Sequence, residues 1–189
     1  GQAKAMTIYV VTTSNWNSPA FWAGVIESAS GHTLDFSALG AAYSVDIDKA
    51  SGVITLSDGA TSFTIGEAGV TGTDANFGGA TLLDYFTVFS GSQGQDSVAG
   101  TSANEVLDGN SGDDALSGDG GDDTLYGNGG ADTLDGGTGA DVVYGGADND
   151  VVFGGGDDDQ LFGEAGSDTL DGGTGDEFID GGADADLIY

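Results

Sequence analysis

The sequence of 189 residues has no cysteine, no arginine, one histidine and one proline. Without cysteine, disulfides and thiolate metal sites are excluded. Two lysines stand against 32 acidic residues, so nucleic acid is excluded as a partner because its phosphates would be repelled and would find almost no basic contacts. Apolar runs extend over a few residues only, which is too short for a membrane-spanning helix, and we expect no membrane insertion.

Glycine and acidic residues are what the sequence has in excess. It holds 37 glycines and a formal charge of −30, a balance typical of disordered chains. Hydrophobic residues nevertheless make up 38% of it, too many for a solvated acidic tail. Residues 91–189 carry 24 acids and no base, whereas the first 90 residues carry eight acids and both lysines. A divalent cation is the obvious group to neutralise the acidic half while its apolar residues pack.

A nine-residue repeat without insertion or deletion fills residues 91–189. Each of the eleven units opens with glycine. The sixth position is always acidic: Asp96, Glu105, Asp114, Asp123, Asp132, Asp141, Asp150, Asp159, Asp168, Glu177 and Asp186. The eighth is always a branched aliphatic: Val98, Leu107, Leu116, Leu125, Leu134, Val143, Val152, Leu161, Leu170, Ile179 and Ile188. A solvated acidic face is the plain alternative, but it does not explain eleven acids in strict register with eleven glycines and eleven aliphatics.

Each unit is predicted to form a turn followed by a very short strand. Glycine, asparagine and aspartate crowd the first four positions, where a tight turn needs positive φ. One inward aliphatic side chain cannot form a core alone, so units must stack. Two units per coil, with partners 18 residues apart, would give two parallel sheets. The predicted fold is therefore mostly β.

The repeat resembles a known family in its residues. The unit over residues 136–144 (Gly-Gly-Thr-Gly-Ala-Asp-Val-Val-Tyr) matches the full pattern of the RTX, or haemolysin-type calcium-binding, nonapeptide array. The resemblance covers 99 of 189 residues. It implies a right-handed parallel β-roll and several bound Ca²⁺ ions, each shared between turns two units apart. The earlier turn gives its acid and the carbonyls of positions two and four, and the later turn its acid and the carbonyls of positions one and three.

Eleven units paired in this way allow nine ions at most, which would leave the acidic half with a charge of about −6, ordinary for a soluble domain. Glu105 and Glu177 replace aspartate and are expected to weaken their sites, and the turn at Ala103 is doubtful because alanine tolerates positive φ less well than aspartate. The resemblance assigns metal binding to Ser92, Gly94, Asp96, Gly109, Asn110, Ser111, Gly112, Asp114, Gly118, Asp119, Gly120, Gly121, Asp123, Gly127, Asn128, Gly129, Gly130, Asp132, Gly136, Gly137, Thr138, Gly139, Asp141, Gly145, Gly146, Ala147, Asp148, Asp150, Gly154, Gly155, Gly156, Asp157, Asp159, Gly163, Glu164, Ala165, Gly166, Asp168, Gly181, Ala183 and Asp186.

An aromatic stripe recurs at position nine of alternate units, at Tyr126, Tyr144 and Phe162. Such a ladder on an outer sheet face can be a platform for a sugar or a protein partner. Cross-strand packing that stiffens a narrow sheet is the interpretation we favour.

The first five residues are interpreted as the remnant of an expression tag. Residues 6–90 are predicted to form a small α+β or mostly-β module that caps the N-terminal end of the array in residues 91–189. Strands are expected at 7–12, 33–36, 43–48, 53–57, 62–65 and 82–89, with a hairpin loop at 49–52 and a helix at 19–29. His32 is the sole histidine and no nucleophile motif surrounds the serines, so we expect no enzyme.

The sequence thus predicts a calcium-binding structural domain that folds on several Ca²⁺ ions outside the cell. The resemblance implies a bacterial protein that is secreted, or displayed at the cell surface, through a type I system, and we expect the chain to be a fragment of a longer protein. Two alternatives remain open. One is an adhesin or carbohydrate-binding module with a glycan or protein partner, and the other is a surface or filament unit that associates end to end.

Overall fold

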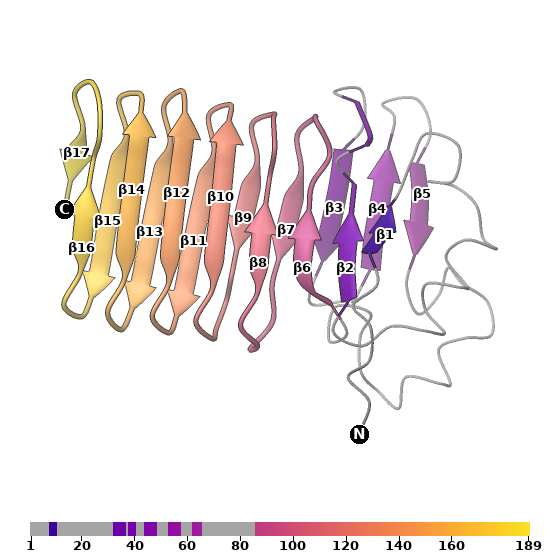
Figure 1. Ribbon diagram of the computed structural model, residues 1–189, viewed down its shortest axis with the longest axis horizontal. Helices are drawn as coiled ribbons and strands as arrows, with labels where there is room; N and C mark the ends of the chain where they lie inside the picture. The colour runs from indigo at the N-terminus through magenta and orange to yellow at the C-terminus, as the bar shows by residue number, and fades with distance from the viewer. Residues whose placement is uncertain are drawn as a thin grey trace.

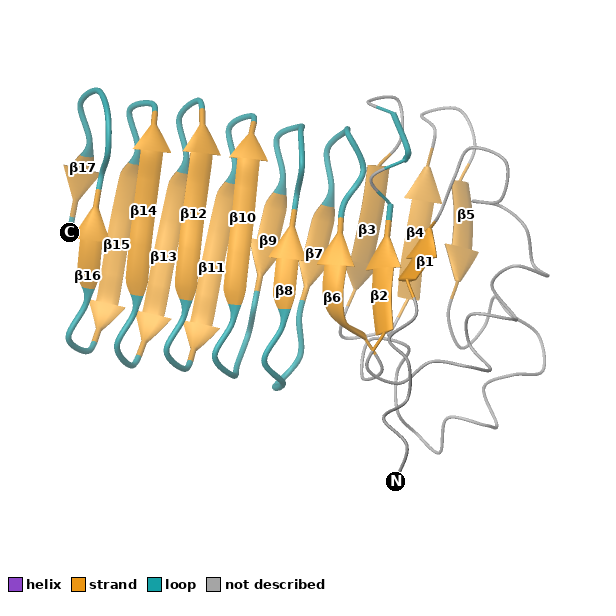
Figure 2. Cartoon of the chain, in the orientation of Figure 1, coloured by secondary structure: helices purple, strands orange, loops and turns teal. Residues whose placement is uncertain are grey.

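The computed structural model describes residues 8–10, 32–36, 38–40, 44–48, 53–57, 62–65 and 86–189. The expected tag remnant and the expected helix at 19–29 lie outside the described residues. Every regular element in the described part is a strand, as Figure 2 shows. In that part of the chain no helix has the length and apolar character needed to cross a membrane.

The strands form two sheets that face each other along a flat, elongated body (Figure 1). The first sheet has the order β1 (Ile8–Val10), β2 (His32–Asp35), β6 (Phe86–Ser90), β8 (Val106–Asp108), β10 (Thr124–Gly129), β12 (Val142–Ala147), β14 (Gln160–Ala165) and β16 (Phe178–Asp180). The second has the order β17 (Leu187–Ile188), β15 (Thr169–Thr174), β13 (Val151–Gly156), β11 (Thr133–Thr138), β9 (Ala115–Ser117), β7 (Ser97–Ala99), β3 (Ser44–Asp48), β4 (Val53–Ser57) and β5 (Ser62–Ile65).

Successive repeat strands alternate between the two sheets, and each pairs in parallel with the strand 18 residues later. Leu125 in β10 aligns with Val143 in β12, and Leu134 in β11 aligns with Val152 in β13. Two nonapeptides therefore make one coil, and the predicted parallel β-roll is confirmed. The chain must cross between the sheets at every turn, which places the turns along both long edges of the roll.

The core of the roll is a single layer of aliphatic side chains from position eight. In β7 the buried Val98 lies between two outward residues, because side chains alternate faces along a strand. The position-eight residues from Val98 to Leu170 are at most 3% exposed. Each contributes about 1.5–3 kcal/mol by leaving water. Because one residue per unit is a thin core, stability depends on contacts between neighbouring coils.

Each predicted N-terminal strand overlaps a strand of the described residues, although Phe36 lies just after β2, and these strands continue the sheets of the roll. The predicted bounds 53–57 and 62–65 coincide with β4 and β5, and β3 and β4 form the expected antiparallel hairpin. β2 pairs in parallel with β6, and β3 pairs in parallel with β7. The boundary at residue 90 between a cap and the roll stays a prediction, since both sheets extend across it.

The described residues 32–36, 38–40 and 44–48 contribute a further layer to the two sheets, and they lack the repeat sequence. β2 lies in the first sheet, β3 lies in the second, and between them Phe36 and Leu39 are fully buried. The Phe36 N–H donates to the Ser90 carbonyl at 2.7 Å, and the Gln93 N–H donates to the Leu39 carbonyl at 3.0 Å. This layer therefore covers the first repeat with apolar side chains and backbone hydrogen bonds.

Candidate metal sites

Nine of the eleven turns of the roll share a backbone conformation that explains their composition. In the nine units from Gly109 onward, positions two and four both have positive φ. The residues other than glycine at these positions are Asn110, Asp119, Asn128, Asp148, Asp157, Glu164 and Asp184. Aspartate at position four is thus accommodated, as the sequence indicated, because aspartate and asparagine enter this region more easily than most residues.

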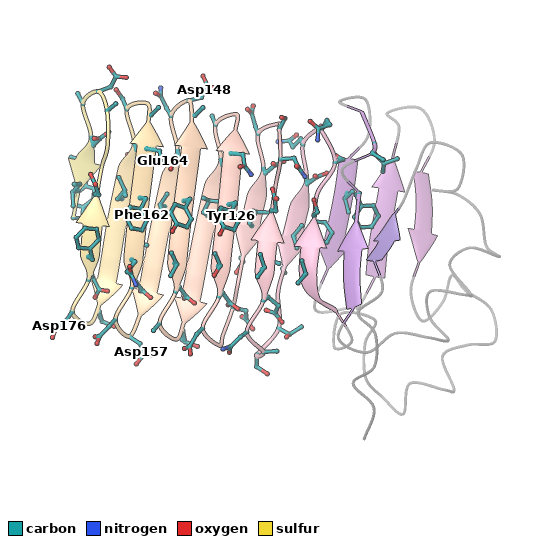
Figure 3. All side chains as sticks on the ribbon, viewed as in Figure 1. Tyr126, Asp148, Asp157, Phe162, Glu164 and Asp176 are labelled. Carbon is teal, nitrogen blue, oxygen red and sulfur yellow. The ribbon has the colours of Figure 1, made fainter. Side chains whose placement is uncertain are left out.

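The turns of alternate units lie on opposite edges of the roll. Figure 3 shows Asp148 and Glu164 along one edge and Asp157 and Asp176 along the other. Since coils repeat every 18 residues, each edge carries its own column of position-six acids. One column holds Asp96, Asp114, Asp132, Asp150, Asp168 and Asp186, and the other holds Glu105, Asp123, Asp141, Asp159 and Glu177.

One oxygen of each carboxylate is held by the backbone of the neighbouring coil. The Asp132 N–H, for example, donates to Oδ1 of Asp150 at 2.8 Å. Nine such bonds of 2.7–3.0 Å run along the two columns, each from the N–H of one acid to the carboxylate 18 residues later. They orient the carboxylates toward the interior of the turns.

The other oxygen has no partner. Eight buried carboxylate oxygens lack a hydrogen bond: Oδ2 of Asp114, Asp123, Asp132, Asp141, Asp150, Asp159 and Asp168, and Oε1 of Glu177. The seven aspartates are at most 3% exposed. An unpaired buried carboxylate costs several kcal/mol. A row of such oxygens fits a set of cations that bind between the turns.

The first-position glycine leaves room where these oxygens converge. A Cβ on Gly127 would lie within 3.0 Å of both Asp132 Oδ2 and the carbonyl oxygen of Gly145. Gly163 has the same relation to Asp168 and to the carbonyl oxygen of Gly181. Calcium takes oxygen ligands at about 2.3–2.6 Å, so an ion suits the place that a side chain would fill.

Burial raises the pKa of the position-six acids. The pKa is raised to about 8 at Asp114 and to about 7 at Asp123 and Asp150, first because burial penalises the charged form and then because neighbouring carboxylates repel it. The same burial raises the pKa of Asp132 and Asp141 to about 6. The pKa values of Asp159 and Asp168 are raised for the same reason. Without a cation, the folded state therefore holds a proton on Asp114, and in part on Asp123 and Asp150, at neutral pH.

The donor set consists of hard oxygens. Among the described residues no three histidine or acidic side chains converge on one point, so a bound ion would combine two carboxylates with backbone carbonyls. Oxygen ligands in a flexible cage suit Ca²⁺ rather than softer metals. The predicted positions from Gly109 to Asp168 all lie in turns of this one geometry, and Ala183 and Asp186 extend it, since the Ala183 N–H donates to the Glu164 carbonyl at 2.7 Å and Asp186 accepts from the Asp168 N–H.

The first two turns differ, although Ser92, Gly94 and Asp96 were predicted to bind metal like the rest. Asp96 Oδ1 accepts from the Ser92 hydroxyl at 2.8 Å, and Oδ2 accepts from the Ser92 N–H at 2.6 Å. In the next turn both carboxylate oxygens of Glu105 accept from Thr101, from its hydroxyl and from its N–H. The second and fourth positions of these turns also lack positive φ. A hydroxyl at position two is the sequence signal that marks them.

Position five carries a second, outer set of hydrogen bonds that the sequence analysis missed. Oδ1 of Asp113 accepts from the Ala131 N–H at 3.0 Å, and Oδ1 of Asp122 accepts from the Ala140 N–H at 3.1 Å. These bonds run in the opposite direction to those of position six, from the later turn to the earlier one. They fix the spacing of consecutive turns on each edge.

The aromatic stripe is a stack of rings. The Tyr126 and Tyr144 rings have centroids 5.1 Å apart with planes 4° apart, and Tyr144 and Phe162 follow at 4.9 Å and 10° (Figure 3). Phe178, which stands at position seven and was missed in the sequence, continues the stack at 5.7 Å with a tilt of 48°. Each inner ring is covered on both faces by its neighbours, so cross-strand packing accounts for the stripe.

Comparison with known proteins agrees with this geometry. The RTX calcium-binding nonapeptide repeat matches in four overlapping copies, at residues 90–125, 99–134, 126–161 and 153–188. No similar chain was found among the curated proteins compared. The match covers more than half of the sequence, and RTX nonapeptide repeats bind Ca²⁺. The chain belongs to the family of RTX calcium-binding repeat proteins.

Proposed function

We propose that this chain is a calcium-folded structural domain of a secreted bacterial protein, which stays unfolded where calcium is scarce and folds on several Ca²⁺ ions outside the cell. The observation that carries the proposal is the row of eight buried carboxylate oxygens without a partner. Residues 91–189 contain no base, so a positive charge for these oxygens must come from an ion. Binding energy then becomes folding energy.

Each ion would bind between two turns on one edge. At the centre of the roll its ligands would be the carboxylates of Asp132 and Asp150 together with backbone carbonyls, which for this pair are those of Asn128, Gly130, Gly145 and Ala147. The position-three carbonyl of the later turn already accepts one hydrogen bond, as Ala147 does from the Gly130 N–H. A carbonyl oxygen has a second lone pair, so this bond and an ion are compatible.

A structural role fits the residues better than catalysis. The buried acids of the roll come in equivalent pairs along its whole length, whereas an active site brings different groups to one place. His32, the sole histidine, lies in β2. Export as an unfolded chain through a type I system is consistent with a fold that depends on external calcium.

The glycan-binding alternative finds little support in the aromatic stack. Sugars bind aromatic side chains through the ring faces, and the faces of Tyr144 are covered by Tyr126 and Phe162. End-to-end self-association stays a prediction, and sedimentation velocity with and without calcium measures it directly.

The experiment is a calcium titration of the full chain followed by far-UV circular dichroism, with magnesium as the control. Magnesium demands near-ideal octahedral geometry and loses its water reluctantly, so it should not replace calcium. We expect a cooperative change from coil to β-structure with calcium alone. A spectrum that is already ordered in chelator and indifferent to calcium would contradict the proposal.

A further inference from the structure

We infer that the first two turns of the roll, residues 91–96 and 100–105, close without calcium, so that the chain binds seven ions and not the nine that its eleven repeats allow. The inference rests on the proposed calcium-dependent folding and concerns which turns take part in it. Its basis is the contrast between Asp96 and Glu105, whose oxygens all have partners, and the acids that follow them.

In these turns a hydroxyl and a backbone N–H bind the carboxylate oxygens for which an ion is proposed in the later turns. The Oδ2 of Asp96 lies beside the first-position glycine, Gly91, as the equivalent oxygens do in the other turns. Here that oxygen accepts the Ser92 N–H at 2.6 Å, and the Ser92 hydroxyl accepts the Gly94 N–H at 3.1 Å. The turn is thus closed by donors of its own, each of which would have to be displaced by an ion.

The second turn repeats the arrangement with threonine. Thr101 donates its hydroxyl and its N–H to the two oxygens of Glu105, and its hydroxyl accepts the Ala103 N–H at 3.1 Å. Position four here is alanine, with φ outside the left-handed region. Glu105 was expected to be a weakened calcium ligand. Its longer side chain instead brings both carboxylate oxygens to the donors of Thr101.

The described residues 32–36, 38–40 and 44–48 lie next to the first coil of the roll and contribute to its first turn. The Val45 N–H donates to Oδ1 of Asp96 at 2.7 Å, in the place that the N–H of an earlier position-six acid takes elsewhere. The side chain of Val45 is apolar, so the column of acids on this edge ends at Asp96. The Gln93 N–H is held by the Leu39 carbonyl. Apolar packing and hydrogen bonds thus stabilise this end, and Val45 adds no second buried carboxylate beside Asp96.

The number of ions follows from the unpartnered oxygens. Of the eight acids that have one, seven are followed by a turn 18 residues later in this sequence, and those seven run from Asp114 to Asp168. The pairs that begin at Gly91 and Gly100 drop out. The calcium-independent end would then serve as a preformed platform on which the calcium-dependent coils stack, because a repeat array grows by adding units to a folded neighbour.

Native mass spectrometry of the full chain at saturating calcium tests the count. We expect seven ions in the unmodified chain, no change in Asp96→Asn, and the loss of at least one ion in Asp114→Asn. The third result shows that the assay detects one missing site. Eight or nine ions, or the loss of an ion in Asp96→Asn, would overturn the inference.

Hydrogen–deuterium exchange in chelator tests the same idea without calcium. Amides of residues 86–108 should exchange more slowly than those of residues 127–189, and Ser92→Ala should remove the protection around Gly94. Ser167→Ala, which deletes an exposed hydroxyl from a later turn, is the control and should change nothing. Equal, fast exchange throughout the unmodified chain in chelator would overturn the inference, while a calcium-indifferent circular dichroism spectrum would instead contradict the proposed function.

Discussion

The backbone N–H of Asp132 donates to Oδ1 of Asp150 at 2.8 Å, while Oδ2 of each of the two residues is buried without a partner. The two oxygens of each position-six carboxylate thus have different roles. One oxygen joins successive coils through the backbone, and the other faces the place proposed for an ion. Asparagine keeps the first oxygen and removes the charge that the second role requires.

Asp132→Asn should therefore weaken calcium-dependent folding strongly. Asp132 belongs to the proposed sites on both sides of its turn, so one or two ions should be lost and the calcium midpoint of folding should rise at least about tenfold, or ~1.4 kcal/mol. Asp135→Asn changes an exposed carboxylate three residues away and is the control. Equal midpoints in the two variants, measured by circular dichroism, would show that Asp132 does not bind calcium.

Gly127→Ala tests the space beside the carboxylate. The new methyl group would lie within 3.0 Å of Asp132 Oδ2 and of the Gly145 carbonyl oxygen, so it should exclude an ion even though the φ of Gly127 lies outside the left-handed region. Gly129→Ala is the matched control, because the nearest atom to its Cβ, the Asn110 carbonyl oxygen, is 3.9 Å away. Loss of at least one ion is expected in Gly127→Ala alone. A full set of ions in that variant would mean that calcium does not bind beside the first-position glycine.

Several of these features were predictable from the sequence because they are local. The register of glycine, acid and aliphatic determines the coil, so two nonapeptides per coil and the position-eight core were predicted and are confirmed. The hydrogen bonds of Ser92 and Thr101 were not predicted, because the repeat pattern is defined by positions one, six and eight. A hydroxyl at position two does not break that pattern, although it supplies the acid with another partner.

The strands before the repeats were predictable from the sequence, but their pairing with the strands of the roll was not. The hairpin of β3 and β4 has a local signal, whereas the parallel pairing of β3 with β7 joins Asp46 to Ser97. Pairing over such a distance leaves no periodic trace in the sequence. Phe178 was missed for a related reason, since it reaches the aromatic stack diagonally from position seven instead of position nine.

Tyr144→Ala should test the aromatic stack as a structural feature. The variant loses two ring contacts, each worth about 0.5–1.5 kcal/mol beyond the buried area. The thermal midpoint of the calcium-loaded chain should fall while the number of bound ions stays the same. Leu134→Ala, which removes a fully buried core side chain, should cost more, about 2–5 kcal/mol. A Tyr144→Ala chain as stable as the unmodified one would leave the stack without a structural role.

Acid should partly replace calcium in the metal-free chain. The pKa of Asp114 is raised to about 8 and that of Asp132 to about 6 in the folded state, while both have ordinary values near 3.8 when unfolded. The folded state therefore binds more protons than the unfolded chain. Its stability is greatest when these acids are protonated and falls as the pH rises from about 4 through about 6 to 8. In chelator, β-structure measured by circular dichroism should increase as the pH is lowered from about 8 to about 5, above the isoelectric point of about 4.1.

Calcium binding should also depend on pH, but low pH should weaken it, whereas low pH stabilises the metal-free fold. Because protons and calcium compete for the same carboxylates, binding should release protons, and the calcium midpoint should rise as the pH falls below about 7. Titrations in two buffers of different ionisation enthalpy measure the protons released. Asp132→Asn should release fewer protons than the unmodified chain. A calcium midpoint independent of pH between 5 and 8 would mean that the buried carboxylates are not the groups that bind the ion.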